Sequence, residues 1–271
     1  MLEELERLLD YLACNLNVKE QKEIESLYQR TLRYEPVERL PLYVSYPLPD
    51  DSLFLPFPHH EVVSDPDKML YNELVSAFGL SIANRFAFSL HDDLPFTVRP
   101  NFGTVVIASM FGGVVERRGD NPPWVRHFET KDRFLKVLDT DPHDHSRGLC
   151  PLVVERCQYF EEVLSAFPPL AGVVHLVLPD LQGPLDTLDV LRGSDMYLDF
   201  YEDPAMVEKA LSLIAEAQVS FAKALLPFVS EIAPGFSCQH GTMIRGSILI
   251  RNDSTVMLSP AMYRDMVFPH D

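Results

Sequence analysis

The chain has 271 residues, of which 46% are hydrophobic and 23% are charged. This balance is typical of a globular protein with a sizeable core, and it excludes a disordered polyelectrolyte and a coiled coil. Acidic residues outnumber basic residues by 40 to 23, which gives a formal net charge of −17. Because no block of Lys and Arg interrupts this acidity, we expect no nucleic-acid partner.

We expect no signal for export or membrane insertion in this sequence. The first seven residues carry acids where a signal peptide carries bases. The most apolar stretch, Leu170–Pro179, is far shorter than the roughly 20 residues that span a bilayer. The four cysteines are scattered and include no CxxC pair: Cys14, Cys150, Cys157 and Cys238. We therefore expect no disulfide framework. We therefore expect a reduced, cytoplasmic protein without a membrane partner.

The N-terminal part of the sequence predicts three helices and a short strand. Leucines at three- and four-residue intervals from Leu2 to Leu12 form one apolar stripe and predict the first helix. A second helix is expected over 19–34. A third opens at Asp65-Pro66-Asp67, with proline and an acid in its first turn, and reaches about Ala83. The apolar segment 42–46 predicts a buried strand, which Pro47 ends.

The rest of the chain alternates strands with helices. The strands are expected over 96–101, 172–178 and 246–250. The second of these is an apolar run, which is typical of a strand buried on both faces. The helices are expected over 103–110, 152–167 and 204–229, and from Ser259-Pro260 onward, where serine caps and proline takes the first position. This alternation predicts an α/β protein with parallel strands.

Three polar segments directly follow predicted strands. They are Arg99-Pro100-Asn101, Asp180-Leu181-Gln182-Gly183-Pro184 and Arg251-Asn252-Asp253-Ser254. In parallel α/β folds, reacting residues gather where strands end and loops begin, so the three segments together predict a shared site. The alternative is that each segment caps the helix that follows it, because Asn, Asp and Ser are the usual capping residues.

Histidines and a cysteine offer further candidate ligands. His143 and His145 lie in a proline-bounded loop without a third ligand nearby, which favours a solvated loop over a metal site. Cys238 and His240 are also too few for a zinc site, and we interpret them as a buried thiol beside an imidazole that lines the cleft. His175 lies within an apolar strand, and we expect it to be a core histidine with a satisfied hydrogen bond.

Segments spread over most of the chain resemble the uroporphyrinogen decarboxylase superfamily. The more specific ones are the Gln-Gly-Pro segment, 181–185, and the Leu-Ser-Pro segment, 258–263. The others are 33–44, 101–112, 191–193 and 253–254. The resemblance implies a (β/α)8 TIM barrel with its site at the carboxyl ends of the strands. It implies an N-terminal helical segment over 1–40 and a partial barrel over 41–271, because about three strand–helix units of such a barrel should follow Asp271.

The sequence departs from the haem-pathway decarboxylase of that superfamily at the substrate site. Decarboxylases carry an Arg-Gln-Ala-Gly-Arg motif after the first strand, whereas segment 43–49 has no arginine to meet substrate carboxylates. Asn101 stands where the decarboxylase aspartate holds the pyrrole NH groups, and a neutral amide lacks the charge that stabilises a protonated pyrrole. We therefore expect a methyltransferase-like or otherwise divergent enzyme of the superfamily that acts on a small polar substrate.

We assign acid–base roles in this enzyme to Asp253 and His240. The residues expected to bind or orient the substrate are Asn101, Gln182, Asp180 and Arg251. The superfamily includes zinc-dependent methyltransferases that act with corrinoid cofactors, so zinc is expected only if its ligands lie beyond Asp271. A corrinoid protein and a second copy of the chain are the candidate protein partners. Two alternatives stay open: uroporphyrinogen decarboxylation at a divergent site, and a barrel remnant without catalytic activity.

Overall fold

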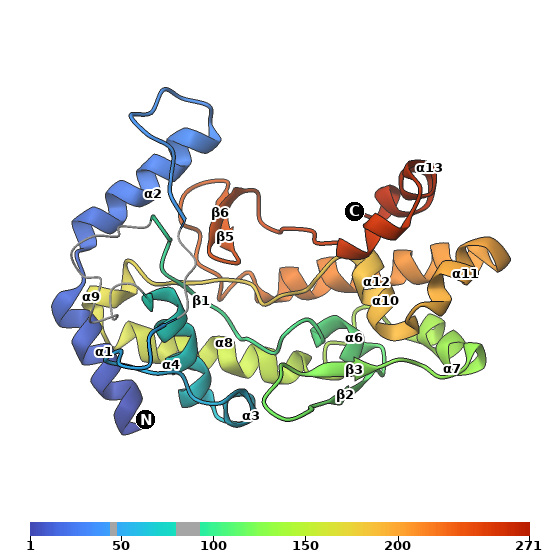
Figure 1. Ribbon diagram of the computed structural model, residues 1–271, viewed down its shortest axis with the longest axis horizontal. Coiled ribbons are helices and arrows are strands. Elements are labelled where there is room, and N and C mark those ends of the chain that lie inside the picture. The colour runs from blue at the N-terminus through green and yellow to red at the C-terminus, as the bar shows by residue number, and fades with distance from the viewer. Residues whose placement is uncertain (44–47, 80–92) are drawn as a thin grey trace. The chain divides into compact units, whose positions relative to one another are not determined.

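A computed structural model describes residues 1–43, 48–79 and 93–271 (Figure 1). The chain divides into two compact units, each assembled from three separate stretches of sequence. The first unit contains Met1–Asn101, Arg156–Leu178 and Phe228–Leu249. The second unit contains Phe102–Glu155, Pro179–Pro227 and Ile250–Asp271. Helices and short strands occur along the chain, so the coarse prediction of a mixed α/β protein is confirmed.

The first unit combines helices with two pairs of short strands. Its helices are α1 (Glu3–Asn15), α2 (Val18–Leu32), α3 (His59–Val62), α4 (Pro66–Ala77) and α9 (Pro168–Ala171), and α8 (Cys150–Ser165) belongs to both units. Strand β1 (Thr97–Val98) pairs in parallel with β4 (His175–Leu176). Strands β5 (Phe236–Gln239) and β6 (Thr242–Arg245) form an antiparallel hairpin. The predicted strands near 97 and 175 are thus present and parallel, although each has two residues.

Helices α1 and α4 pack against each other as their apolar spacing predicts. The leucines at 5, 8, 9 and 12 are at most 2% exposed, so the stripe of α1 faces the core. Helix α4 begins at Pro66, and the Asp65 carboxylate caps it by accepting the backbone N–H groups of Asp67 and Lys68. Helix α4 also contacts β1, and it thereby places its buried face beside the end of that strand.

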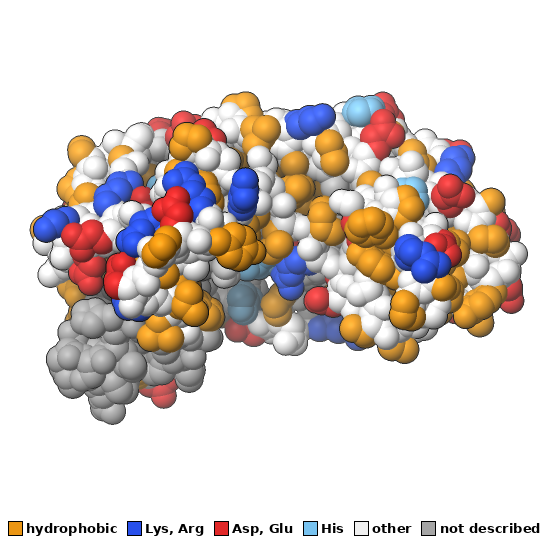
Figure 2. All heavy atoms as spheres, turned by 90° about the horizontal axis from the view of Figure 1, so that it is seen from above, with side chains coloured by type: hydrophobic (Ala, Val, Ile, Leu, Met, Phe, Trp, Pro, Cys, Tyr) orange, Lys and Arg blue, Asp and Glu red, His pale blue; other side chains and the backbone are white. Residues whose placement is uncertain are grey.

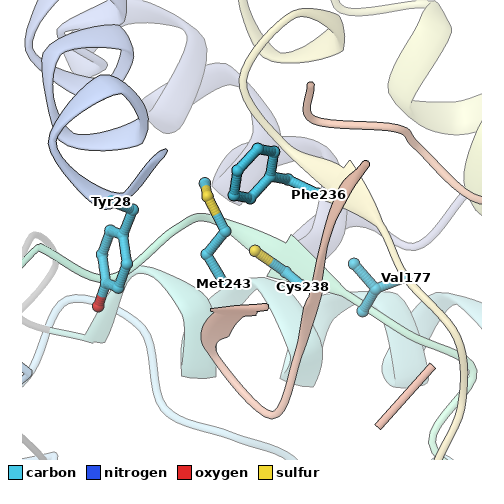
Figure 3. Packing of buried hydrophobic residues seen from close by; sticks show 5 residues of the cluster. All are labelled: Tyr28, Val177, Phe236, Cys238 and Met243. Carbon is cyan, nitrogen blue, oxygen red and sulfur yellow. The ribbon is translucent and has the colours of Figure 1, made fainter. Parts of the chain in front are cut away.

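The β5–β6 hairpin closes a small apolar cluster in the first unit (Figure 3). Its members are Tyr28 from α2, Val177, and Phe236, Cys238 and Met243 from the hairpin. Burial raises the pKa of the Cys238 thiol to about 12, so this side chain stays protonated at neutral pH and packs as a small hydrophobic group. Strands β5 and β6 are joined by His240 and Gly241, with φ angles of 51° and 70°. Positive φ at both positions is typical of a type I′ turn.

The second unit is built mainly from helices. Its helices are α6 (Val106–Met110), α7 (Lys131–Leu135), η1 (Lys136–Asp139), α10 (Pro184–Arg192), α11 (Asp195–Glu202), α12 (Pro204–Leu225), η2 (Asp253–Met257), α13 (Pro260–Met262), η3 (Tyr263–Val267) and η4 (Phe268–His270). Strands β2 (Val114–Glu116) and β3 (Trp124–Arg126) form an antiparallel hairpin. The predicted serine cap of the last helices is confirmed, since Ser259 Oγ accepts the Met262 N–H at 3.2 Å.

Helix α12 packs against α10, α11 and η1 and carries much of the core of the second unit. Its buried face includes Ile214 and Phe221, both 0% exposed. The buried Gln218 side chain donates from Nε2 to the Leu181 carbonyl at 3.0 Å and to Thr187 Oγ1 at 3.3 Å. These bonds hold the loop before α10 against α12, and that loop contains part of the predicted site.

Two strand predictions differ from the structure. Segment 246–250 is not a strand, because β6 ends at Arg245 and Gly246 turns the chain with a φ of 128°. The Leu249 N–H instead donates to the Gln239 side chain at 2.6 Å. In the predicted strand 42–46, residues 44–47 lie outside the described residues, while Leu42 and Tyr43 are exposed and belong to no strand. The last part of the predicted third helix, 80–83, also lies outside the described residues.

The pairing of the strands is more varied than the sequence predicts. One pair is parallel, as predicted for the strands near 97 and 175, and two are antiparallel hairpins that were not predicted from the sequence. These pairs form three two-stranded sheets, and no closed barrel occurs within the described ranges. None of the helices described has the length and hydropathy that crossing a membrane demands. Acidic and basic side chains are interspersed on the face that Figure 2 shows.

Candidate functional site

Four of the six predicted site residues meet in the second unit, and we call them the Asp180 cluster: Asp180, Gln182, Arg251 and Asp253. Asp180 is 7% exposed and accepts hydrogen bonds from Arg251 Nη1 at 2.8 Å and from the Gln182 N–H at 3.1 Å. Arg251 Nη2 lies 3.8 Å from Asp253 Oδ2, so Asp180 is its closer partner. The Asp253 side chain is 84% exposed and therefore lies in solvent.

Two neighbouring helices of the Asp180 cluster cap each other. The residue before α10 has no capping side chain, and Asn252 Oδ1 instead accepts the N–H groups of Leu185 at 3.0 Å and Asp186 at 3.2 Å. In return, the Asp186 carboxylate accepts the N–H groups of Asp253 and Ser254, each at 2.8 Å. The first N–H groups of a helix have no partner within it, so both contacts stabilise helix starts. Asn252 thus caps the distant helix α10, whereas the alternative interpretation of this segment placed its cap on the helix that follows, η2, to which the Asn252 side chain gives no capping bond.

We expect the Asp186→Ala variant to lose about 1–2 kcal/mol of unfolding free energy, because it leaves two N–H groups without an acceptor. Asp186 is 5% exposed, so water does not readily replace the carboxylate. Asp253→Ala should change that free energy by less than about 0.5 kcal/mol, because an exposed side chain is removed. Urea denaturation followed by circular dichroism measures both variants. Equal losses would show that the Asp253 side chain supports the fold as much as Asp186 does.

The other two predicted residues, Asn101 and His240, meet in the first unit. They join Glu73 and Arg99 in what we call the Glu73 cluster, whose four side chains are all half-buried. Glu73 lies on α4, and its Oε1 accepts from Asn101 Nδ2 at 2.8 Å while its Oε2 accepts the Arg99 N–H at 3.2 Å. Arg99 Nη1 lies 3.1 Å from Nδ1 of His240, which is held in the β5–β6 turn. The end of β1 therefore places Arg99 and Asn101 beside an acid from α4 and a histidine from the hairpin.

Glu73 is the ionisable group of this cluster whose pKa is clearly shifted by its environment. Removal from water raises the pKa of Glu73, because the carboxylate loses more solvation than the neutral acid. The positive charge of Arg99 and the hydrogen bonds from Asn101 and the Arg99 N–H oppose this shift without cancelling it. Glu73 therefore keeps its proton to higher pH than an ordinary glutamate. A perturbed carboxyl beside a specific charged partner is a typical feature of a functional site.

Arg99 keeps hydrogen-bond donors for a ligand. Its backbone N–H and Nη1 are engaged by Glu73 and His240, whereas Nε and Nη2 make no hydrogen bond with any described residue. The planar guanidinium presents Nε and one Nη side by side, in a fork that matches the two oxygens of a carboxylate. His240 Nδ1 accepts from Arg99 when the ring proton is on Nε2. The cluster thus combines an anion-binding fork, an acid and an amide.

Two other histidines singled out from the sequence, His175 and His143, have structural partners. His175 is 7% exposed and its Nε2 lies 2.8 Å from Glu25 Oε1, so the predicted core histidine with a satisfied hydrogen bond is confirmed. His143 lies 2.9 Å from Glu216 and 3.0 Å from Ser220, and these contacts tie its loop to α12. Within 1–43, 48–79 and 93–271, no three His, Cys, Asp or Glu side chains are grouped as metal ligands.

Sequence reasoning missed the role of Glu73 in the Glu73 cluster. The signal for it was available, because Glu73 interrupts the apolar face that Met69, Leu70, Leu74 and Ala77 form on α4. An acid on the buried face of a helix requires a partner, and it is a better indicator of a site than an acid in a loop. Arg99 lay within a segment singled out after a predicted strand, but no role was assigned to it.

Comparisons with protein-family models, with curated proteins and with solved structures find no match for this chain. The assignment of a function therefore rests on the geometry of the two clusters. In the Asp180 cluster, the buried carboxylate is paired with an arginine and the remaining acid is in solvent. The Glu73 cluster offers a proton and an anion-binding fork at one place, and it carries the functional argument.

Proposed function

We propose that this chain is an enzyme that binds a small, carboxylate-bearing substrate at the Glu73 cluster and transfers a proton to or from it. One observation carries the proposal: in the half-buried Arg99, two nitrogens, Nε and Nη2, bond to no described residue, and they lie beside a carboxyl group whose pKa is raised. A bidentate arginine fixes a carboxylate in position, and positioning is a large part of catalysis. A protonated Glu73 next to it is a general acid at a pH where an ordinary glutamate has lost its proton.

The other members of the Glu73 cluster orient this chemistry. Asn101 donates to Glu73 Oε1 and thereby fixes the plane of the carboxyl group, which leaves Oε2 beside the Arg99 N–H. His240 contacts Arg99 Nη1 and restrains the guanidinium so that its free edge is presented. In this proposal the acid role first given to Asp253 passes to Glu73, because Asp253 is 84% exposed and a general acid works best partly removed from water.

Membership of the uroporphyrinogen decarboxylase superfamily, with a divergent site on a (β/α)8-type framework, is part of the proposal. It is supported by the position of Arg99 and Asn101 directly after β1, a strand that pairs in parallel with β4. Asn101 donates its amide to Glu73, so it supplies no negative charge to a substrate, and we propose a reaction other than uroporphyrinogen decarboxylation. The four cysteines are free thiols, which suits a reducing setting such as the cytoplasm.

Carboxylate binding tests the proposal, with succinate as the probe and its uncharged diamide as the control ligand. We expect succinate to raise the melting temperature of the chain, because a ligand that binds only the folded state stabilises it. Arg99→Gln should weaken succinate binding by about tenfold or more, the loss expected for a charge-assisted hydrogen bond. Arg245→Gln is the matched control, since Arg245 is exposed on β6 of the same unit. Equal shifts with the diamide, or equal binding by both variants, would refute the proposal.

The pH dependence of succinate binding tests whether Glu73 lies at the binding site. As pH rises through the raised pKa of Glu73, this carboxyl gains a negative charge beside the ligand, so binding should weaken. Glu73→Gln stays neutral at every pH, so its binding should follow only the ionisation of succinate itself, and the binding of the unsubstituted chain should fall below it as pH rises. A profile unchanged by the substitution would exclude Glu73 from the site.

A further inference from the structure

A cavity of about 390 Å³ lies within the second unit, and its lining is unusually basic for this chain. It carries four basic side chains, Arg126, Arg133, Lys136 and Arg147, and one acid, Glu129. The whole chain has a net charge of −17, so a local excess of basic over acidic side chains is not expected from its composition. The volume falls in the range of small-molecule sites, about 300–1,000 Å³.

Two of the four basic side chains, Lys136 and Arg147, make no ion pair with any residue that the structure describes. Arg126 Nε lies 3.2 Å from Glu116 Oε1, and Arg133 Nη1 lies 3.4 Å from Glu129 Oε2. Arg147 donates from Nε to the Met110 carbonyl at 2.9 Å and makes no ion pair within the described ranges, and its charge acts on Asp144 only through space. Lys136 makes no hydrogen bond or ion pair with the part of the chain that the structure describes. The cavity therefore has two positive charges outside the ion pairs of the described residues, and an anion can pair with both.

The backbone around Arg147 is held in place against α6. The Leu149 N–H donates to Ser109 Oγ at 2.9 Å. Gly148 has a φ of 57°, and a Cβ there would come within 2.4 Å of Ser109 Oγ, so the loop approaches α6 as closely as a glycine allows. With Nε fixed on Met110, the two Nη groups of Arg147 are the part left for a ligand. A cation held in advance loses little freedom when it binds its partner.

We propose that this cavity binds a small molecule that bears a phosphoryl group. Arg147 supplies a planar fork and Lys136 a compact point charge, a combination that suits a phosphoryl group with several oxygens and more than one negative charge. The Thr140 hydroxyl lines the same cavity and adds a hydrogen-bonding group. The apolar lining, with Phe111 and Val137, leaves room for an organic body attached to the phosphoryl group. This site lies in the second unit, and the inference does not depend on the function proposed for the Glu73 cluster.

The only tryptophan of the chain, Trp124, reports on this cavity. It lies on β3, two residues before Arg126, and its ring centroid is 6.4 Å from that of the lining residue His127. Titration with pyrophosphate should give a saturable change in tryptophan fluorescence. Lys136→Gln and Arg147→Gln should each raise the Kd by about tenfold. Arg118→Gln, in the turn of the same hairpin and outside the lining, should leave it unchanged.

Several outcomes would overturn this inference. These are the absence of saturable binding, an identical Kd in Lys136→Gln and Arg118→Gln, and an equal fluorescence change with sodium chloride at matched ionic strength. Citrate that binds as tightly as pyrophosphate would overturn the phosphoryl assignment, because it would show that any multiply charged anion suffices. If the Arg147→Gln variant unfolds because the bond to Met110 is lost, the Lys136→Gln variant alone decides, since Lys136 is exposed and bonds to none of the described residues.

Discussion

The Glu25→Ala variant should lose about 3 kcal/mol of unfolding free energy, because it leaves a buried imidazole without its hydrogen-bond partner. Glu25 and His175 are 3% and 7% exposed, and the carboxylate lies 2.8 Å from the ring nitrogen of His175. The pair joins α2 to β4, two elements far apart in sequence. Because little water reaches the site, the lost contact is not replaced by solvent.

Glu23→Ala is the matched control on the same helix. Glu23 is 67% exposed and lies 3.7 Å from Lys19, and a surface pair of this kind contributes less than about 1 kcal/mol. Chemical denaturation of both variants gives the difference. A loss from Glu25→Ala no larger than that from Glu23→Ala would show that the buried pair does not stabilise the first unit.

The same pair makes stability depend on acid pH. Burial favours a higher pKa for Glu25, but hydrogen bonds and charge from His175 and Lys22 outweigh it and lower the pKa below its ordinary value. The unfolded chain therefore binds a proton before the folded chain does. The contribution of Glu25 is complete above the unfolded pKa, near 4.3, and is lost as pH falls through the lower folded pKa. Glu25→Gln should flatten this acid limb of the stability profile.

Helices were predicted better than strands for a physical reason. Helix α1 has an apolar stripe of four leucines, and α4 has an Asp cap followed by proline, so each helix is specified by residues within itself. A strand forms only against the strand with which it pairs, and the sequence of one segment does not identify that partner. Segment 246–250 has the composition of a strand, yet Gly246 turns the chain and the Gln239 side chain takes the Leu249 N–H.

The candidate site was predicted in part, and the missing part depends on tertiary contacts. Strand-end reasoning selected Asn101, and His240 was chosen separately as the imidazole beside Cys238; the two do share one cluster with Arg99. It could not supply Glu73, because that residue comes from α4, well before β1 in the sequence. Nor could it show that Asn252 caps α10 from a distant segment. Spacing indicates which face a residue occupies, whereas its partner follows only from the fold.

Gly183→Ala should cost about 2–4 kcal/mol, the combined effect of overpacking and a weakened helix cap. A Cβ on Gly183 would lie 2.1 Å from Asn252 Oδ1 and 2.7 Å from the Arg251 carbonyl oxygen. The backbone of Gly183 has a φ of −111°, which any residue adopts, so the cause is lack of space and not backbone strain. Gly172→Ala is the control, because φ there is −102° and a Cβ would meet nothing within 4 Å.

A double-mutant cycle with Asn252→Ala separates the two parts of this loss. Asn252→Ala alone removes the cap of α10 and should cost about 1 kcal/mol. If the added methyl group acts by displacing the Asn252 side chain, Gly183→Ala should cost much less in the Asn252→Ala background. If it acts by pushing on the Arg251 carbonyl, the two losses should add, because a backbone oxygen cannot turn away. Thermal unfolding of the four proteins gives the coupling. If Gly183→Ala kept the full stability of the unsubstituted chain, the backbone at Gly183 could not lie as close to Arg251 and Asn252 as the structure places it.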